Sequence, residues 1–163
     1  MVSELDVAEL RALAGAVPDP EIPVLTLDDL GIVRDLRVAP DGGVEVDLTP
    51  TYTGCPATTV IAGDVEAALR SAGVARASVR TVLVPAWTTD WMSEEGRRKL
   101  RRYGIAPPGP AGSGGTVALT LSVRCPQCGS GDTREASRFG STPCKSLWVC
   151  RACSEPFDSF KAI

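Results

Sequence analysis

Four of the six cysteines in this 163-residue chain fall into two pairs with metal-ligand spacing. Cys125 and Cys128 form one Cys-x-x-Cys pair, and Cys150 and Cys153 form the other. Two residues between thiolates let one turn direct both sulfurs at an ion, and a second turn completes a tetrahedron. The sequence contains no histidine, so cysteines are the available soft ligands. Four thiolates suit a structural zinc site or an iron site.

We favour structural zinc at these four cysteines over a catalytic zinc. Residues 116–163 contain few large apolar side chains, and a segment of this size needs a metal clip to fold. Cys144 lies between the two pairs and is surplus to a tetrahedron. Three interpretations of Cys144 stay open: an alternative ligand, a redox or cluster-handling thiol, and a small buried hydrophobic residue.

The sixth cysteine, Cys55, directly precedes Pro56 at the start of a predicted helix. Proline is favoured at the first helical position, which puts Cys55 at the N-cap. There, unpaired amide N–H groups and the positive end of the helix dipole face the sulfur. We predict that Cys55 ionises more readily than a free thiol, whose pKa is about 8.5. The alternative is a small buried residue that packs the helix start.

Two carboxylates, Asp19 and Glu21 of "PDPEIP", are predicted neighbours of Cys55. Residues two apart in an extended chain point to the same side. If this loop folds against the helix start, both acids and Thr51 or Thr53 form one polar pocket beside the thiol. The alternative is that the acids are solvated turn residues.

The elements that position these residues are marked by glycine, proline and apolar periodicity. The predicted elements are a helix capped by Ser3 that stops before "VPDPEIP", strands over 32–38 and 44–48, a helix from Pro56 to Gly73, a strand in 77–87 and a helix from Ser93 to Gly104. Pro40 to Gly43 join the first two strands as a β-hairpin.

This order of short elements favours a small α+β domain over residues 1–106, with a short mixed sheet and flanking helices. "PPGPAGSGG", residues 107–115, is a flexible linker by composition. Residues 116–163 then form a second domain, a four-cysteine zinc ribbon.

Composition and charge limit the classes of function. The net charge of −3 argues against a general nucleic-acid role. The sequence contains no apolar run long enough to span a membrane and has no signal peptide, so we expect a cytoplasmic protein. A zinc-ribbon module that binds protein or nucleic acid is one alternative function. A thiol-dependent enzyme that uses Cys55 is another, although a Cys–His nucleophile is excluded by the missing histidine.

Four stretches carry a resemblance to a known family over nearly the whole chain. They are "DPEIPVLTLDDLGIV", "PTYTGCPATT", "PAWTTDWMSEEGRRKLRRYGI" and "FGSTPCKSLWVCRACSEPFDSFK". Together they resemble the D subunits, or accessory proteins, of the phenylacetyl-CoA monooxygenase complex, also called the phenylacetyl-CoA epoxidase. Residues 1 to about 106 resemble the wider SufT-type iron–sulfur-assembly family, which has a small α+β domain.

The resemblance implies a role in aerobic phenylacetate catabolism, where the complex adds one oxygen atom to the ring of phenylacetyl-CoA. Other subunits supply the di-iron oxygenase and the flavin and iron–sulfur reductase. The accessory protein is then a non-catalytic factor that assists maturation of an iron–sulfur or di-iron centre or assembly of the complex. The zinc ribbon would dock one of these client subunits.

The resemblance also implies a functional pocket. Matched residue by residue, the family's pocket falls on Asp19, Glu21, Thr51 and Cys55, and Tyr52 stands where many relatives have a second threonine. In this interpretation, Cys55 transiently holds iron or an iron–sulfur cluster, and the two acids supply oxygen ligands or handle protons.

Overall fold

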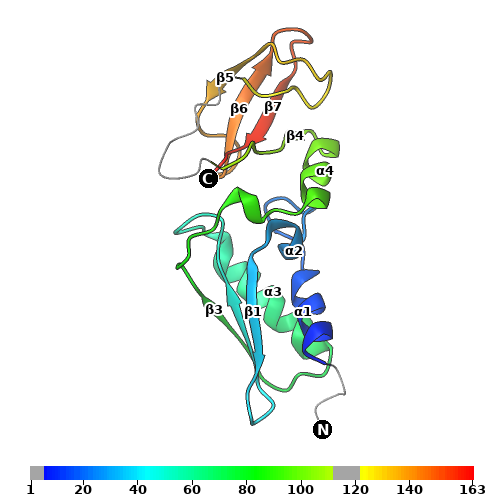
Figure 1. The fold of residues 1–163 in the computed structure, drawn as a ribbon, viewed down its shortest axis with the longest axis vertical. Helices are drawn as coiled ribbons and strands as arrows, with labels where there is room; N and C mark the ends of the chain where they lie inside the picture. Colours follow the sequence, from blue (N-terminus) through cyan, green and yellow to red (C-terminus); the bar gives the residue numbers. More distant parts are fainter. Residues whose placement is uncertain (1–5, 112–121) are drawn as a thin grey trace. The chain divides into compact units, whose positions relative to one another are not determined.

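The computed structural model describes residues 6–111 and 122–163, which divide after Trp87 into two compact units. Figure 1 shows the helices and strands of both units. Ser3 and residues 112–115 of the predicted linker lie outside the described residues. In the part of the chain that is described, no helix has the length and apolar character needed to cross a membrane.

Unit 1, which ends at Trp87, is built on a three-stranded mixed sheet. Its elements are α1 (Val7–Gly15), α2 (Leu27–Leu30), β1 (Val33–Val38), β2 (Val44–Leu48), α3 (Ala57–Ser71) and β3 (Ala77–Thr81). β1 pairs antiparallel with β2, and β2 pairs parallel with β3. The predicted hairpin, long helix and third strand are confirmed. The short helix α2 was not predicted, because four residues are too few to show a helical period.

Helix α1 is capped by Asp6, so the predicted cap at Ser3 is wrong. Asp6 Oδ1 accepts a hydrogen bond from the Glu9 amide at 2.8 Å, and Glu9 Oε2 accepts one from the Asp6 amide at 2.9 Å. This reciprocal pair is a capping box, which satisfies two amides at the helix start. Asp6 is therefore the N-cap of α1.

Helix α3 connects the parallel strands β2 and β3, as a crossover helix does. It buries Ala57, Ile61, Val65 and Leu69, which recur every four residues and form one face. Helices α1 and α3 lie on the same side of the sheet (Figure 1). Their packing against the sheet fixes the start of α3 and, with it, the position of Cys55.

The opposite face of the sheet carries a charge cluster around Asp47. Its carboxylate accepts hydrogen bonds from Arg80 Nε at 2.9 Å, Arg80 Nη2 at 2.8 Å and Arg37 Nη1 at 3.0 Å. Asp47 is 7% exposed. These hydrogen bonds from Arg80 and Arg37 hold the pKa of Asp47 well below its usual range.

Unit 2, which begins at Thr88, is built on a four-stranded sheet with the order β4-β7-β6-β5. Its elements are the 3₁₀ helix η1 (Thr89–Trp91), α4 (Glu94–Arg102), β4 (Ile105–Ala106), β5 (Thr133–Ser137), β6 (Lys145–Cys150) and β7 (Pro156–Phe160). Strands β5, β6 and β7 pair antiparallel, and β4 pairs parallel with β7. The predicted helix after Ser93 is α4, and Ser93 caps it. One apolar cluster in the unit is small and consists of Ala106, Cys125, Trp148, Cys150 and Phe157.

The predicted domain boundary at residue 106 stays a prediction. Ile105 and Ala106 pair with Asp158 and Ser159, so they belong to the same sheet as the ribbon strands. The compact units divide earlier, after Trp87, and α4 and β4 belong to unit 2.

Candidate functional site

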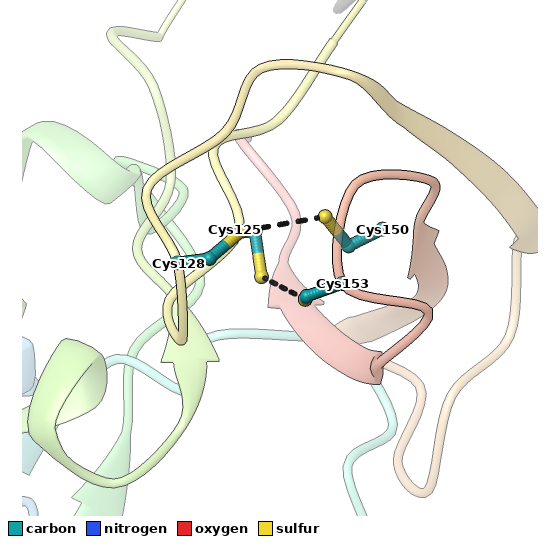
Figure 2. A group of neighbouring side chains, drawn as sticks. All are labelled: Cys125, Cys128, Cys150 and Cys153. Atoms are coloured by element: carbon teal, nitrogen blue, oxygen red, sulfur yellow. Dashed lines mark hydrogen bonds between the residues drawn. The ribbon is translucent and has the colours of Figure 1, made fainter.

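The four paired cysteines of unit 2 come together in one cluster. Cys125 and Cys128 precede β5, Cys150 ends β6, and Cys153 lies in the turn before β7. Figure 2 shows the side chains approaching one another from two separate turns. Their four sulfur atoms all lie within 4.8 Å of one another. The turns therefore bring together donors that are distant in the sequence.

The two cysteine turns share one backbone construction. The amide of the first cysteine donates to a carbonyl five residues later, Cys125 N to Ser130 O and Cys150 N to Glu155 O, each at 2.9 Å. The residue after the second cysteine is left-handed in both turns, Gly129 with φ 75° and Ser154 with φ 65°. Left-handed residues are usually glycine, so Ser154 keeps a strained conformation to complete its turn.

The spacing of the sulfur atoms fits a tetrahedral metal ion. Cys125 Sγ lies 3.8 Å from Cys153 Sγ, and Cys128 Sγ lies 3.6 Å from Cys150 Sγ. Four sulfurs at about 2.3 Å from a central zinc ion are separated by about 3.8 Å. Tetrahedral sets of four thiolates hold zinc or iron. The cluster can therefore hold either metal without a large rearrangement.

Backbone amides prepare one of these sulfurs for metal binding. The N–H of Cys153, and with it that of Ala152, donates to the Cys150 sulfur and lowers the pKa of this thiol to about 7. A thiol must lose its proton to bind a metal, so Cys150 is prepared to bind near neutral pH. Burial and the neighbouring sulfurs instead raise the pKa of Cys153 to about 12, and the metal must displace that proton.

Cys144 is remote from this cluster. It directly precedes β6, whereas Cys150 is the last residue of β6. An extended strand rises about 3.3 Å per residue, which separates the two residues by about 20 Å. This geometry excludes Cys144 as an alternative ligand. Cys144 is 7% exposed, and its sulfur lies 3.0 Å from Thr142 Oγ1. Burial and this hydrogen bond support the interpretation as a small buried residue.

Cys55 lies one residue outside the position predicted for it. The N-cap of α3 is Pro56, and the helix begins at Ala57. The Cys55 sulfur nevertheless accepts hydrogen bonds from the amides of Ala57 and Thr58. The backbone N–H groups at the start of α3 therefore reach the Cys55 thiol, as predicted from the sequence.

The predicted sign of the Cys55 pKa shift is wrong. Burial raises the pKa of the thiol, and the negative charges of Glu21 and Asp19 raise it further. The two amide donors lower it, but by less than these effects together. The half-buried thiol is therefore protonated at neutral pH, whereas the N-cap argument predicted easier ionisation.

Asp19 and Glu21 both act on Cys55, but their loop is bent and not extended. Asp19 is 8% exposed, and its Oδ1 accepts hydrogen bonds from the amides of Glu21 and Ile22, each at 2.8 Å. The Asp19 amide donates to Leu25 O at 2.8 Å and closes the loop. Asp19 is thus a buried turn-forming residue, which excludes the alternative of a solvated one.

The loop before Cys55 contains Thr51, which was predicted as a site residue, and Thr49, whose buried hydroxyl, unpaired in the described part of the chain, was not predicted. Thr51 is half-buried and forms no side-chain hydrogen bond within the described residues. Thr49, at the start of the loop, is 1% exposed, and its Oγ1 has no partner among the residues that the structure describes. A threonine that ends a strand gives no sequence signal of an unpaired hydroxyl, because the pairing depends on the surrounding fold.

Two family models match the chain. Residues 8–84 match the iron–sulfur cluster assembly protein family, and residues 110–161 match the PaaD zinc beta ribbon domain. The chain also resembles the crystal structure of a domain of unknown function, DUF59, from Bacillus anthracis. The TM-score is 0.53 and the identity 29%, over 57% of this chain and 89% of that chain. Fold and cysteine cluster thus define an iron–sulfur-assembly-type protein with a C-terminal zinc ribbon.

Two relatives narrow this class. A protein of Escherichia coli (strain K12), named as the D component of a 1,2-phenylacetyl-CoA epoxidase, is 49% identical over 96% of this chain and 93% of the relative. A protein of Porphyromonas gingivalis named Fe-S protein maturation auxiliary factor is 40% identical over 52% of this chain and 80% of the relative. The chain belongs to the family of phenylacetyl-CoA epoxidase D subunits. The predicted family and the α+β fold with a zinc ribbon are confirmed.

Proposed function

We propose that this chain is a non-catalytic accessory subunit of a phenylacetyl-CoA epoxidase complex that helps to mature an iron–sulfur or di-iron centre in another subunit. The names of the two relatives support both parts of the proposal, the complex and the maturation role. The oxygenase and reductase subunits are the proposed clients. The setting is the cytoplasm, where thiols stay reduced.

The observation that carries the proposal is the grouping of Cys55, Glu21 and Asp19. A half-buried thiol lies within the electrostatic reach of two carboxylates. Sulfur and carboxylate oxygen are both ligands for iron. Within the described residues only the four paired cysteines of unit 2 converge as a ready-made metal-ligand set, so iron at Cys55 would be held by few protein donors, which suits cargo that is held briefly and then passed on. Cys55 is the proposed sulfur ligand.

Because the pKa of Cys55 is raised, iron binding at this thiol must be accompanied by release of a proton. The thiol of Cys55 is neutral at neutral pH, so iron binding must displace its proton. The displaced proton leaves to solvent, and the carboxylates of Glu21 and Asp19 can offer oxygen atoms to the iron. A neutral thiol is a weak nucleophile, so the same pKa argues against a thiol enzyme that uses Cys55.

The cysteine cluster of unit 2 is the proposed site of a structural zinc ion. The family description of this segment supports zinc, and the small apolar core supports a structural role. Metal analysis of the purified chain separates the two candidate metals. Colourless protein with one zinc ion per chain would support the proposal. Visible absorbance together with bound sulfide would instead show that the site holds an iron–sulfur cluster.

The decisive experiment for the maturation role compares Cys55→Ser with Cys144→Ser during expression of the epoxidase subunits. We expect Cys55→Ser to lower the iron content and the activity of the client, and Cys144→Ser to leave both unchanged. Hydrogen-exchange protection of α3 controls for the folding of unit 1, which contains Cys55, and the zinc content controls for the folding of unit 2, which contains Cys144. Full iron content and full activity of clients matured with Cys55→Ser would refute the proposed role of Cys55.

A further inference from the structure

An ordered loop of unit 2 holds a large aromatic ring in solvent. This loop, residues 138–144, connects β5 to β6 and is called the Phe139 loop below. Phe139 is 74% exposed. Its amide donates to Ser137 Oγ at 3.1 Å, and the Gly140 amide donates to Lys145 O at 2.8 Å. The ring is therefore exposed by a defined loop conformation.

An ion pair between buried Lys145 and half-buried Asp158 anchors the Phe139 loop to β7. Lys145 Nζ lies 3.2 Å from Asp158 Oδ2, and Ser141 Oγ donates to the same oxygen at 2.9 Å. Gly140 packs so tightly here that a Cβ atom would lie 2.7 Å from Asp158 Oδ1. A side chain at this position would clash, so the close packing requires glycine. The loop is thus built as a rigid support.

One cation lies over the exposed ring, and a second precedes it in the sequence. Lys161 Nζ lies 4.8 Å from the centroid of the Phe139 ring and donates to Pro143 O at 2.8 Å. Arg138, the residue before Phe139, is exposed. Within residues 6–111 and 122–163, neither cation forms an ion pair with a carboxylate. The ring therefore has one cation against it, Lys161, and one exposed cation next to it in sequence, Arg138, and neither has a counter-charge among the described residues.

We propose that the Phe139 loop is a docking surface for a protein partner with an apolar pocket bordered by carboxylates. Aromatic side chains held rigidly at a surface are typical energetic centres of protein interfaces. Unpaired cations beside such a ring select an acidic surface and speed its approach. This inference rests on the proposed function, since it identifies the partner as the client subunit of the epoxidase.

Charge favours a protein partner over a nucleic acid. Stable binding to a nucleic acid needs several neutralised phosphates. The Phe139 loop and Lys161 together offer two cations, and the chain as a whole carries 17 basic and 20 acidic residues. One aromatic anchor and two charges suit a pocket on a protein, where most of the affinity comes from a few buried contacts.

The test measures the affinity of the full-length, zinc-loaded chain for each purified oxygenase and reductase subunit. Phe139→Ala should raise the Kd at least about tenfold, as loss of a central aromatic anchor does. Arg138→Glu should raise it about threefold to tenfold and weaken the salt dependence. Two matched controls, Tyr103→Ala at another exposed aromatic residue and Arg134→Glu on β5, should change the Kd by less than about twofold.

Three outcomes would overturn the docking surface. An unchanged Kd for Phe139→Ala is the first. The second is Phe139-dependent binding of a single-stranded oligonucleotide without binding of any subunit. The third is self-association of the chain that Phe139→Ala abolishes, which would make a second copy the occupant.

A parallel measurement on Cys55→Ser separates this inference from the proposed function. Cys55→Ser should bind the client with an unchanged Kd while the client fails to acquire iron. If the Cys55→Ser chain matures the client fully while Phe139→Ala weakens binding, the docking surface stands and the iron-carrying role falls. If the wild-type chain binds no subunit, both fall.

Discussion

Cys144 and Cys150 stand at opposite ends of strand β6, so one full strand separates the surplus thiol from the four-cysteine cluster. We therefore expect Cys144→Ala to retain one metal ion per chain and Cys150→Ala to lose it. Cys144→Ala should lower the free energy of unfolding by about 1 kcal/mol, because it removes a buried sulfur atom. Elemental analysis and chemical denaturation measure the two effects. Metal loss in Cys144→Ala would show that the thiol reaches the cluster.

Removal of the metal should unfold unit 2 and spare unit 1. The apolar cluster around Trp148 in the ribbon is small, whereas α1 and α3 bury an extensive face of the sheet in unit 1. A strong chelator is expected to abolish hydrogen-exchange protection in β5, β6 and β7, while protection in α3 persists. Readdition of zinc should restore the ribbon. Retained protection in β6 after complete metal removal would contradict the structural role.

The thiol of Cys55 should react slowly with iodoacetamide at neutral pH. Burial and the charges of Glu21 and Asp19 raise its pKa above the ordinary value, so the fraction of thiolate is small. Glu21→Gln removes one negative charge and should lower the pKa and speed alkylation. Asp64→Asn, on an exposed part of α3, is the control and should change nothing. Mass spectrometry of the Cys55 peptide measures the rate as a function of pH.

Ser154→Gly should stabilise the ribbon by about 0.5 to 1 kcal/mol, because glycine adopts φ near 65° without the strain of a side chain. The reverse change, Gly129→Ser, should destabilise by about 1 kcal/mol, since Gly129 has φ 75° in the matching turn. No atom lies within 4 Å of a Cβ atom built at Gly129, so any destabilisation by Gly129→Ser would come from backbone strain and not from a steric clash of the side chain. Thermal unfolding of both zinc-loaded variants measures the difference. If both variants changed the free energy of unfolding in the same direction, this account would be contradicted.

Asp47 should make unit 1 sensitive to acid. Its pKa in the folded chain is lowered by Arg80 and Arg37, so its stabilising effect is present above the ordinary pKa of about 3.9 and is lost as the pH falls below that value. Asp47→Asn should cost about 1 kcal/mol at pH 7, a modest amount because both arginines face solvent. Between about pH 5 and pH 2, the free energy of unfolding of Asp47→Asn should fall less steeply than that of the wild-type chain. Hydrogen exchange in β2 measures this, and a parallel decline in both proteins would refute it.

The parts of the molecule that follow from short-range patterns could be predicted from the sequence. The hairpin, α3 and the two cysteine turns depend on periodicity, turn residues and spacing within a few positions. The cap of α1 was misplaced, because Ser3 and Asp6 are both good caps and the side chain of Glu9 decides between them.

The sign of the Cys55 pKa shift could not be predicted in the same way. The local argument considered only the helix start, which does supply amide donors to the sulfur. The larger effects are burial and the approach of Glu21 and Asp19, which belong to a different loop. The distance between Cys144 and the cluster likewise depends on the length of β6, which apolar spacing alone does not define.

The cysteine cluster has an open side and a closed side. In each Cys-x-x-Cys pair the first sulfur belongs to a buried residue, Cys125 or Cys150 in chain order, and the second residue of each pair, Cys128 or Cys153, is exposed. A metallochaperone or a competing ion would therefore approach from the exposed pair. Metal exchange would proceed through stepwise ligand substitution on that side, so its rate would increase with the concentration of the incoming competitor.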